Sequence, residues 1–246
     1  EACFKLNNRF LVYFAVDLYN VFMTTCLQGQ ATRFMPFNQG SNGAGKTGGA
    51  GNPQNPDGYS TAYLWEEVLQ KDSLMDLIQK FVSFVKEREE VVVSGATKTK
   101  ENAKLIFPRY HQYDVVKKLV SEVKEVGSGR SYLIEHSAGS GKSNSIAWIA
   151  YRLASLHDDD NNAVFDSVIV VTDRRILDKQ IRDTIKQFMQ VANTVAWAEH
   201  SGDLRKAITD GKRIIVTTIE KFPYVVPEIG AEHKDNRFAI IIDEAH

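Results

Sequence analysis

The sequence predicts an α/β fold whose second half is an incomplete parallel sheet with helices on both faces. Three unbroken runs rich in β-branched residues have the composition of strands buried on both sides. They lie at residues 168–171, 214–217 and 239–242. Helical periodicity alternates with these runs, which is typical of a parallel sheet. Ligands of such sheets bind at the carboxyl ends of the strands.

Local signals define the remaining elements of the second half. A short apolar run at residues 132–135 predicts a strand, and residues 144–156 predict a helix. Further helices are expected at residues 176–188 and 203–209. The last of these is expected to be capped by Ser201 and to end at Gly211.

The first half has a different character. It opens with a strand-like run at residues 11–16 and continues into a Gly/Asn/Pro-rich loop at residues 40–58. Residues 73–89 have apolar side chains at helical spacing, and residues 94–101 are small, polar and basic, as in a linker. We therefore expect two domains, residues 1–95 and residues 96–246.

The composition narrows the functional class. Of the 246 residues, 43% are hydrophobic and 25% are charged, which is ordinary for a globular protein. A formal net charge of −1 does not indicate a strongly basic nucleic-acid-binding protein, so such contacts must come from a local patch. Cys3 and Cys26 form no disulfide framework or metal pattern, which favours a cytoplasmic protein. No membrane partner is expected, because no run approaches the roughly 18–20 apolar residues that span a bilayer.

The full phosphate-loop pattern G-x-x-x-x-G-K-[ST] occurs at residues 40–47 (GSNGAGKT). This motif works when a strand delivers the loop and a helix begins at the lysine, so that the first N–H groups of the helix face the phosphates. Pro36 precedes the pattern, and the run GGAGNPQNPDG that follows cannot form a helix. We expect residues 40–47 to be an exposed loop in which Lys46 takes no part in nucleotide binding.

A second, imperfect match at residues 136–143 (HSAGSGKS) has the right context, although His136 replaces the first glycine. A predicted strand leads into it and a predicted helix follows. Lys142 would neutralise the β- and γ-phosphates of ATP, and the Ser143 hydroxyl would be a ligand of Mg²⁺. The alternative is a glycine-rich turn with a surface lysine. The residues expected to contact ATP in this loop are Ser137, Ala138, Gly139, Ser140, Gly141, Lys142 and Ser143.

A pair of carboxylates supports the second loop. Asp243 and Glu244 directly follow the apolar run at residues 239–242, at the carboxyl end of a predicted strand. Phosphoryl transfer needs a carboxylate that holds the metal and an oriented water molecule. Asp243 would hold Mg²⁺ through water, and Glu244 would orient or deprotonate the attacking water. By themselves such residues are usually a solvated turn, but together with a phosphate loop they predict an ATPase with Lys142, Asp243 and Glu244 as its catalytic residues.

With both motifs in place, the chain resembles the superfamily 2 helicases and translocases, whose second motif reads D-E-x-H. The resemblance implies a RecA-like P-loop NTPase domain. The string FPRYHQ at residues 107–112 is similar to the segment that reads adenine, which implies an adenine contact by Gln112. The strings VTDR (171–174) and TTIEK (217–221) resemble segments that touch the nucleic-acid backbone. This implies contacts by Arg174, Thr217 and Thr218, for which the alternatives are a surface ion pair and β-propensity.

Within that superfamily, the chain looks like the restriction, or motor, subunit of type I restriction–modification enzymes. The strings VVTDRRILDKQ (170–180) and IIVTTIEKF (214–222) carry this similarity in the second half. In the first half, FMPFN (34–38) and YLWE (63–66) resemble the end of that subunit's α/β endonuclease domain. The implied partners are duplex DNA and the modification and specificity subunits, in a bacterial or archaeal cytoplasm.

The resemblance also implies what lies outside the sequence. The nuclease carboxylates would precede Glu1, and the second motor lobe with its catalytic arginine would follow His246, so we expect a piece of a longer protein with little activity alone. Three alternatives remain open: an RNA helicase of the DEAH type, a repair or remodelling translocase without a nuclease, and an ATP-binding or docking module without enzymatic activity.

Overall fold

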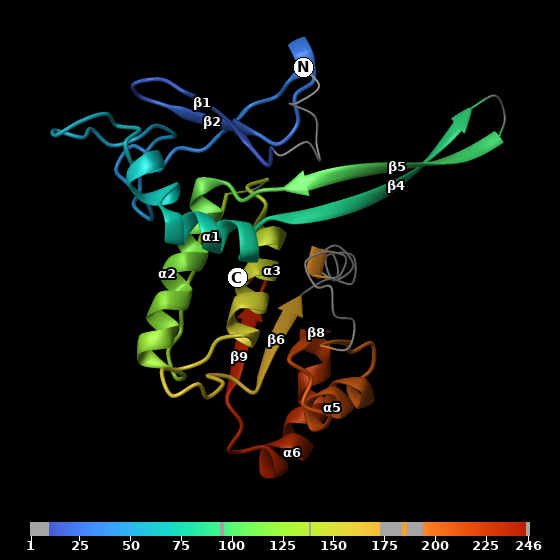
Figure 1. The fold of residues 1–246 in the computed structure, drawn as a ribbon. Helices are drawn as coiled ribbons and strands as arrows, with labels where there is room; N and C mark the ends of the chain where they lie inside the picture. Colours follow the sequence, from blue (N-terminus) through green and yellow to red (C-terminus); the bar gives the residue numbers. More distant parts are fainter. Residues whose placement is uncertain (1–9, 94–95, 138, 173–183, 186–193, 245–246) are drawn as a thin grey trace. The chain divides into compact units, whose positions relative to one another are not determined.

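The structure is a computed structural model that describes residues 10–93, 96–137, 139–172, 184–185 and 194–244, with the backbone alone described at residues 86–103 and 228–232. It confirms the mixed α/β class. By its internal contacts the chain divides into two compact units, residues 1–115 and 116–246, each described here by itself (Figure 1). The expected boundary at residue 95, between nuclease and motor parts, stays a prediction.

The first unit is built on an antiparallel sheet and a layer of aromatic side chains. Strands β1 (Tyr13–Val16), β2 (Val21–Thr24) and β3 (Met35–Pro36) form the sheet in that order. A short 3-10 turn (Gly29–Ala31) and a π-helix (Leu64–Val68) accompany it. Phe37 is fully buried and makes an edge-to-face contact with Tyr110, which contacts Tyr63 in the same way. Burial raises the pKa of Tyr110 to about 12.

The helix expected at residues 73–89 is wrong in its second half. Helix α1 (Lys71–Lys80) ends at Lys80. The chain then enters a long antiparallel hairpin of β4 (Ser83–Val93) and β5 (Ala96–Ile106) (Figure 1). The expected linker at residues 94–101 therefore belongs largely to a strand. The physical reason is that β-branched residues at 91–93 find a partner strand further along the chain, a non-local pairing that periodicity cannot reveal.

The second unit contains the expected parallel sheet. Its four strands are β6 (Ser167–Thr172), β7 (Val195–Trp197), β8 (Ile214–Thr218) and β9 (Phe238–Ile242), in the order β7-β8-β6-β9. All three pairings are parallel, so the carboxyl ends of the strands meet at one edge. The helices of this unit are α2 (Tyr110–Val126, shared with the first unit), α3 (Lys142–Ala154), α5 (Ser201–Thr209) and α6 (Phe222–Glu232), with a 3-10 turn at Ile219–Lys221.

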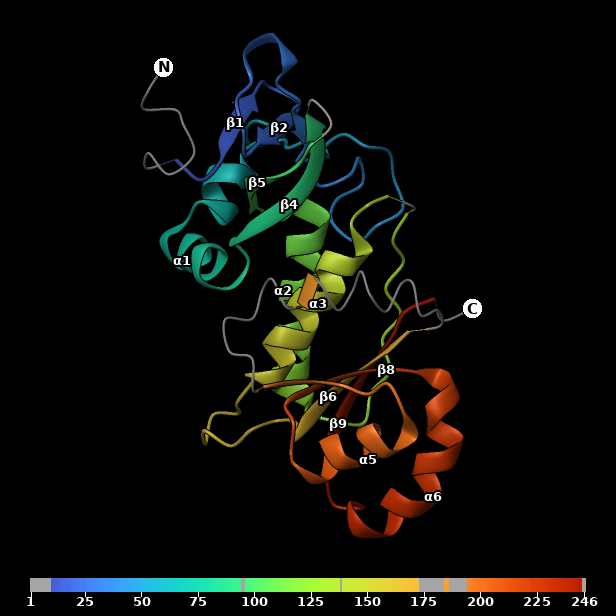
Figure 2. The ribbon, with the colours of Figure 1, turned by 90° about the vertical axis from the view of Figure 1, so that its right-hand side faces the viewer.

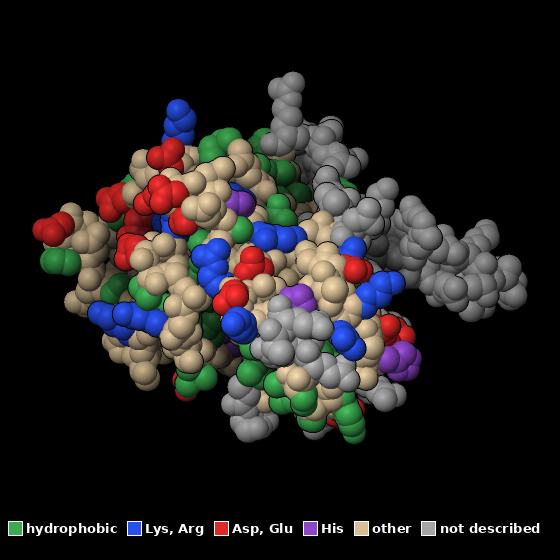
Figure 3. Space-filling model, turned by 90° about the horizontal axis from the view of Figure 1, so that it is seen from below, with side chains coloured by type: hydrophobic (Ala, Val, Ile, Leu, Met, Phe, Trp, Pro, Cys, Tyr) green, Lys and Arg blue, Asp and Glu red, His purple; other side chains and the backbone are tan. Residues whose placement is uncertain are grey.

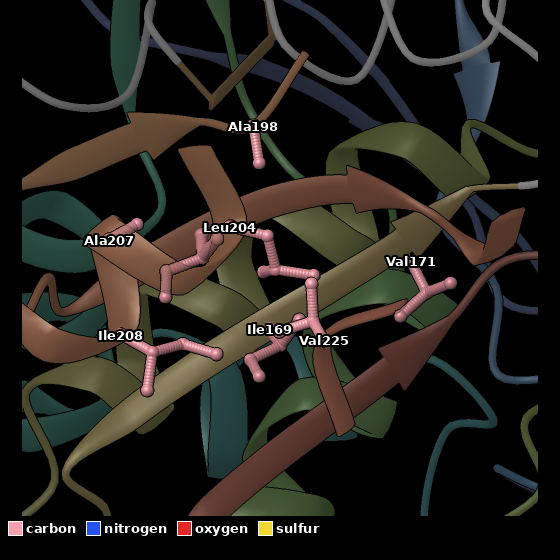
Figure 4. Close-up of a cluster of buried hydrophobic side chains, with 8 residues drawn as sticks. Ile169, Val171, Ala198, Leu204, Ala207, Ile208 and Val225 are labelled. Atoms are coloured by element: carbon pink, nitrogen blue, oxygen red, sulfur yellow. The ribbon is translucent and has the colours of Figure 1, made fainter. Parts of the chain in front are cut away.

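Helices cover both faces of this sheet, as predicted. Helices α5 and α6 pack on one face, where Ile169, Val171 and Ile215 form a buried cluster with Leu204 and Val225 (Figure 4). On the other face α3 contacts β6, β8 and β9 (Figure 2). Because side chains alternate along a strand, the sheet is apolar on both sides, and this explains its unbroken hydrophobic runs.

Two local expectations are wrong. Residues 132–135 form no strand, because the open edge of the sheet at β9 lies across a cavity from them and Leu133 is 80% exposed. A strand needs a neighbour for its N–H and C=O groups, and this segment has none within the described residues. The cap of α5 is His200 rather than Ser201, because the His200 N–H donates to Asp203 Oδ2 at 2.8 Å.

Of the remaining expectations, the helix end at Gly211 is confirmed, and the helix at residues 176–188 lies mostly outside the described residues. Gly211 follows α5 with a φ of +65°, as expected for the residue that ends a helix. Of the helix expected at residues 176–188, only Thr184 and Ile185 lie within the described residues, and both are helical. None of the described helices is long and apolar enough to cross a membrane.

Candidate functional site

The loop at residues 136–143 leads directly into α3, whose first residue is Lys142. Gly139 and Gly141 have φ angles of +74° and +86°, in the left-handed region that glycine adopts most readily. No heavy atom lies within 4 Å of the position that a Cβ on Gly139 would occupy, so space remains beside the backbone there. The first N–H groups of a helix have no acceptor within the helix. The loop thus presents donors at the start of α3, where an anion would bind.

His136 has a role that the sequence pattern did not reveal. Its Nδ1 lies 3.3 Å from Oγ of Ser140, a nearly buried residue whose N–H donates to the carbonyl of Ser137. These contacts brace the turn from within. The side chain in place of the first glycine therefore helps to hold the loop in shape. Ala138 lies outside the described residues.

The two predicted carboxylates lie against Lys142. Its Nζ is 3.0 Å from Glu244 Oε1 and 3.9 Å from Asp243 Oδ1, across about a hundred residues of sequence. Asp243 is placed by the parallel ladder: it follows β9, and its N–H donates to the carbonyl of Val171 on β6. The structure therefore brings together the three residues predicted to be catalytic.

Asp243 is an unusual carboxylate, because it is almost buried. Burial raises its pKa, since the charged form loses hydration, and the nearby Lys142 ammonium opposes that rise. The backbone N–H of Glu244 also donates to Asp243 Oδ1 at 3.1 Å. A buried carboxylate that keeps cationic and N–H partners is suited to hold a positive charge.

A cavity of about 1250 Å³ adjoins this cluster. Residues 127–137, α3 and β9 form its walls, and Lys142, Asp243 and Glu244 lie among its lining residues. The buried Ser145 hydroxyl also lines the cavity and has no hydrogen-bond partner among the described residues. The site thus has the room and the unpaired polar group that a bound polar ligand would use.

The perfect pattern at residues 40–47 has a different structure. Its ends are closed by backbone hydrogen bonds, from Gly40 N–H to the Gly51 carbonyl and from Ser41 N–H to the Gly49 carbonyl, both 2.8 Å. The Asn52 side chain fixes the start of this loop, because its Oδ1 accepts a hydrogen bond from Gln39 N–H at 2.8 Å. No helix follows Thr47 in the described loop, so the geometry that phosphate binding requires is missing there.

Thr217 and Thr218, predicted to touch nucleic acid, end β8 at the carboxyl edge of the sheet. Their side chains are almost fully buried. The Thr218 hydroxyl accepts a hydrogen bond from Lys221 Nζ at 3.0 Å, so its observed role is to hold that lysine. Arg174 lies outside the described residues. On the face shown in Figure 3, basic and acidic side chains are interspersed without a continuous basic field among the coloured residues.

Gln112 belongs to the first unit and is 3% exposed. Its Oε1 accepts the N–H of Arg109 at 2.9 Å, just before α2 begins. A glutamine that reaches back to the residue before a helix is half of a capping box, a structural role that the sequence analysis did not assign.

No group of three or more His, Cys, Asp or Glu side chains in the described part of the chain could hold a metal by itself. This does not conflict with the expected ion, because Mg²⁺ is usually held by one or two carboxylates together with substrate phosphates.

Comparisons with known proteins give a family for the second half of the chain. Residues 111–246, more than half of the chain, match the SWI2/SNF2 ATPase family. The chain is 30% identical over 192 residues to the type I restriction enzyme HindI endonuclease subunit of Haemophilus influenzae, covering 74% of this chain and 17% of that protein. It is 29% identical over 178 residues to the putative type I restriction enzyme MjaVIIP endonuclease subunit of Methanocaldococcus jannaschii, covering 64% and 15%.

These relatives confirm the resemblance to type I restriction subunits, although the chain spans only about a sixth of their length. The family match extends over the loop at residues 136–143 and the carboxylates that meet it. This match agrees with a helix that begins at Lys142 and with a parallel strand that Asp243 directly follows. The chain belongs to the SWI2/SNF2 ATPase family.

Proposed function

We propose that this chain is the ATP-binding part of a DNA translocase within the endonuclease subunit of a type I restriction enzyme. The observation that carries the proposal is the convergence of Lys142, at the start of α3, with Asp243 and Glu244, at the end of β9. The named relatives supply the type of enzyme, because one is named as an endonuclease subunit of a type I restriction enzyme and the other as a putative one.

The residues of the site fit Mg-ATP. When bound, Mg²⁺ supplies positive charge that offsets the charge of the phosphates. Ser143 and Asp243 would hold the ion, Asp243 through water, because hydroxyl and carboxylate oxygens suit a hard cation. Lys142 and the first N–H groups of α3 would bind the β- and γ-phosphates, with residues 137–141 wrapped around them. Glu244 would orient the attacking water.

Gln112 would contact adenine, as the similarity of residues 107–112 to the adenine-reading segment implies. Its Oε1 already caps α2 through Arg109, which fixes the rotamer of the side chain. An amide held in this way keeps one orientation, and a fixed orientation favours recognition of a base edge by hydrogen bonds. The proposed adenine contact therefore uses a group that is ordered before the nucleotide arrives.

Duplex DNA would be contacted at the carboxyl edge of the sheet. The buried hydroxyl of Thr218 orients Lys221, and the half-buried ammonium of Lys221 would then meet a backbone phosphate. Thr217, which precedes Thr218 at the end of β8, would act through the position of the strand, and Arg174 would supply a second phosphate contact. Each such contact should make the decrease of log K with log salt concentration steeper by about one unit.

In the whole protein, ATP hydrolysis would open and close a cleft between two motor lobes and move duplex DNA before cleavage. We propose modification and specificity subunits as partners, and a bacterial or archaeal cell as the setting, because the relatives come from such organisms.

The test is the ATPase activity of the full-length protein with duplex DNA or RNA as the activator. We expect duplex DNA to stimulate hydrolysis and Lys142→Ala to abolish the stimulated rate. Stimulation by RNA alone would replace the proposal with an RNA helicase. Stimulation by DNA in the complete restriction complex, without any cleavage of target DNA, would indicate a translocase without a nuclease.

A further inference from the structure

We propose that, in the absence of nucleotide, the ion pair between Lys142 and Glu244 acts as a latch that occupies the phosphate site and holds the water-orienting carboxylate inactive. This latch rests on the proposed function, because it assigns phosphate binding to Lys142 and water orientation to Glu244. It goes further by stating what these two residues do before ATP arrives.

The geometry of the pair supports the latch. Lys142 Nζ lies 3.0 Å from Glu244 Oε1, which is within hydrogen-bond distance, and 3.9 Å from Asp243 Oδ1. Both members of the closer pair are more than a third exposed, so a ligand can reach them. The lysine that would meet the phosphates thus has its charge directed at the acidic edge of the sheet.

The backbone at Glu244 is also held in an uncommon conformation. Its φ is +56°, in the left-handed region that residues with a Cβ rarely adopt. In this conformation the Glu244 N–H donates to Asp243 Oδ1 at 3.1 Å. An outlier of this kind persists only where surrounding contacts hold it, and such outliers cluster at switch and ligand sites. The ion pair with Lys142 restrains this side chain from across the site.

A bound nucleotide must compete with the latch. A phosphate chain carries more negative charge than one carboxylate, so it withdraws the Lys142 ammonium and repels the Glu244 carboxylate. While Glu244 accepts a hydrogen bond from Lys142, one of its oxygens is engaged and the lysine holds the carboxylate in place. Arrival of the phosphates removes both restraints at once. The latch therefore couples occupation of the site to release of the group that orients water.

The expected size of the effect follows from the exposure of the pair. Ion pairs that remain in contact with water contribute modestly, which corresponds to a change of about two- to fivefold in an equilibrium constant. Removing the charge of Glu244 should therefore tighten nucleotide binding by about that factor. If the effect were only a repulsion between any nearby carboxylate and the phosphates, removing the charge of another acidic residue of the cavity would tighten binding as well.

The experiment measures the affinity of the full-length protein for ADP in the presence of EDTA, so that neither hydrolysis nor metal binding contributes. We compare Glu244→Gln with Glu135→Gln, which removes a carboxylate that lines the same cavity and forms no ion pair with Lys142 in the described part of the chain. Glu244→Asn is a second variant, because asparagine tolerates the left-handed region. The latch predicts binding about two- to fivefold tighter for both Glu244 variants and unchanged for Glu135→Gln.

The outcomes separate the latch from the proposed function. Equal affinity of Glu244→Gln, Glu244→Asn and wild type, with binding lost in Lys142→Ala, overturns the latch and leaves the nucleotide site in place. Equal tightening by Glu135→Gln also overturns the latch, because the effect is then a general repulsion. Unchanged ADP binding by Lys142→Ala contradicts the proposed function itself.

Discussion

Replacing Arg213 by alanine should destabilise the second unit more than any ordinary surface substitution. The Arg213 guanidinium donates from Nη1 to the carbonyls of Phe165 at 3.0 Å and Asp166 at 3.2 Å. Its Nη2 donates to the carbonyl of Ala154, the last residue of α3. One side chain thus ties the end of the helix that begins at Lys142 to the segment that enters β6.

The magnitude follows from these three bonds. A hydrogen bond with a charged donor contributes ~1.5–3 kcal/mol when buried, and the half-buried position of Arg213 favours a lower value of about 1 kcal/mol each. Cationic contacts at the carboxyl end of a helix are also favourable. Arg213→Ala should therefore lower the free energy of unfolding by about 3 kcal/mol, or the thermal midpoint by roughly 6–12 °C for a chain of this size.

The assay is urea unfolding followed by tryptophan fluorescence, to which Trp148, buried within α3, contributes together with Trp65 and Trp197. The control is Arg130→Ala, which removes a surface ion pair with Glu122 whose side chains are 59% and 48% exposed. That change should cost no more than about 0.5 kcal/mol. Equal stability of the two variants would refute the structural role assigned to Arg213.

Three further predictions concern pH and backbone conformation. Burial raises the pKa of Asp243, so its ionised form lowers the stability of the fold near neutral pH. Asp243→Asn should therefore raise the thermal unfolding midpoint of the nucleotide-free protein, measured by calorimetry near neutral pH. This gain in midpoint should disappear as the pH falls toward about 4, where the carboxylate of the unfolded chain is also protonated. Tyr110, with a pKa raised to about 12, stabilises the fold below the unfolded pKa of about 10 and loses that contribution as the pH rises toward about 12; Tyr110→Phe should flatten this loss in circular dichroism, and an unchanged alkaline profile would contradict it. Gly139→Ala should cost about 1 kcal/mol in urea unfolding from backbone strain alone, since no neighbouring atom crowds the new Cβ.

Much of the second unit could be predicted because its signals are local. The strands β6 and β8 are β-branched runs buried on both faces, a pattern that few other structures produce. The run at residues 239–242 also forms a strand, β9, but the expected burial on both faces is wrong there, because β9 lies at the edge of the sheet and Ile240 and Ile242 are more than half exposed. Gly211 ends α5 through a left-handed conformation that glycine favours. The choice of residues 136–143 as the phosphate loop used the helix that follows them, and that helix does begin at Lys142.

What could not be predicted depends on contacts between distant residues. The hairpin of β4 and β5 forms because two extended segments pair along their length, whereas Leu74, Leu77 and Phe81 had suggested one continuous helix. Residues 132–135 have the composition of a strand but find no partner at the edge of β9. The bracing of Ser140 by His136 and the hold of Thr218 on Lys221 are likewise invisible to motif matching, because each depends on a side-chain geometry.

The most direct test of the nucleotide site compares the lysines of the full and the imperfect phosphate-loop matches, Lys46 and Lys142. The full-length protein and its Lys142→Ala and Lys46→Ala variants would be titrated with Mg-ATP by isothermal calorimetry. Lys142 lies at the start of a helix beside Asp243, whereas Lys46 lies in a loop closed by its own backbone hydrogen bonds. We expect Lys142→Ala to lose binding and Lys46→Ala to bind as the wild type does. Loss of binding in Lys46→Ala with binding retained in Lys142→Ala would contradict the site described here.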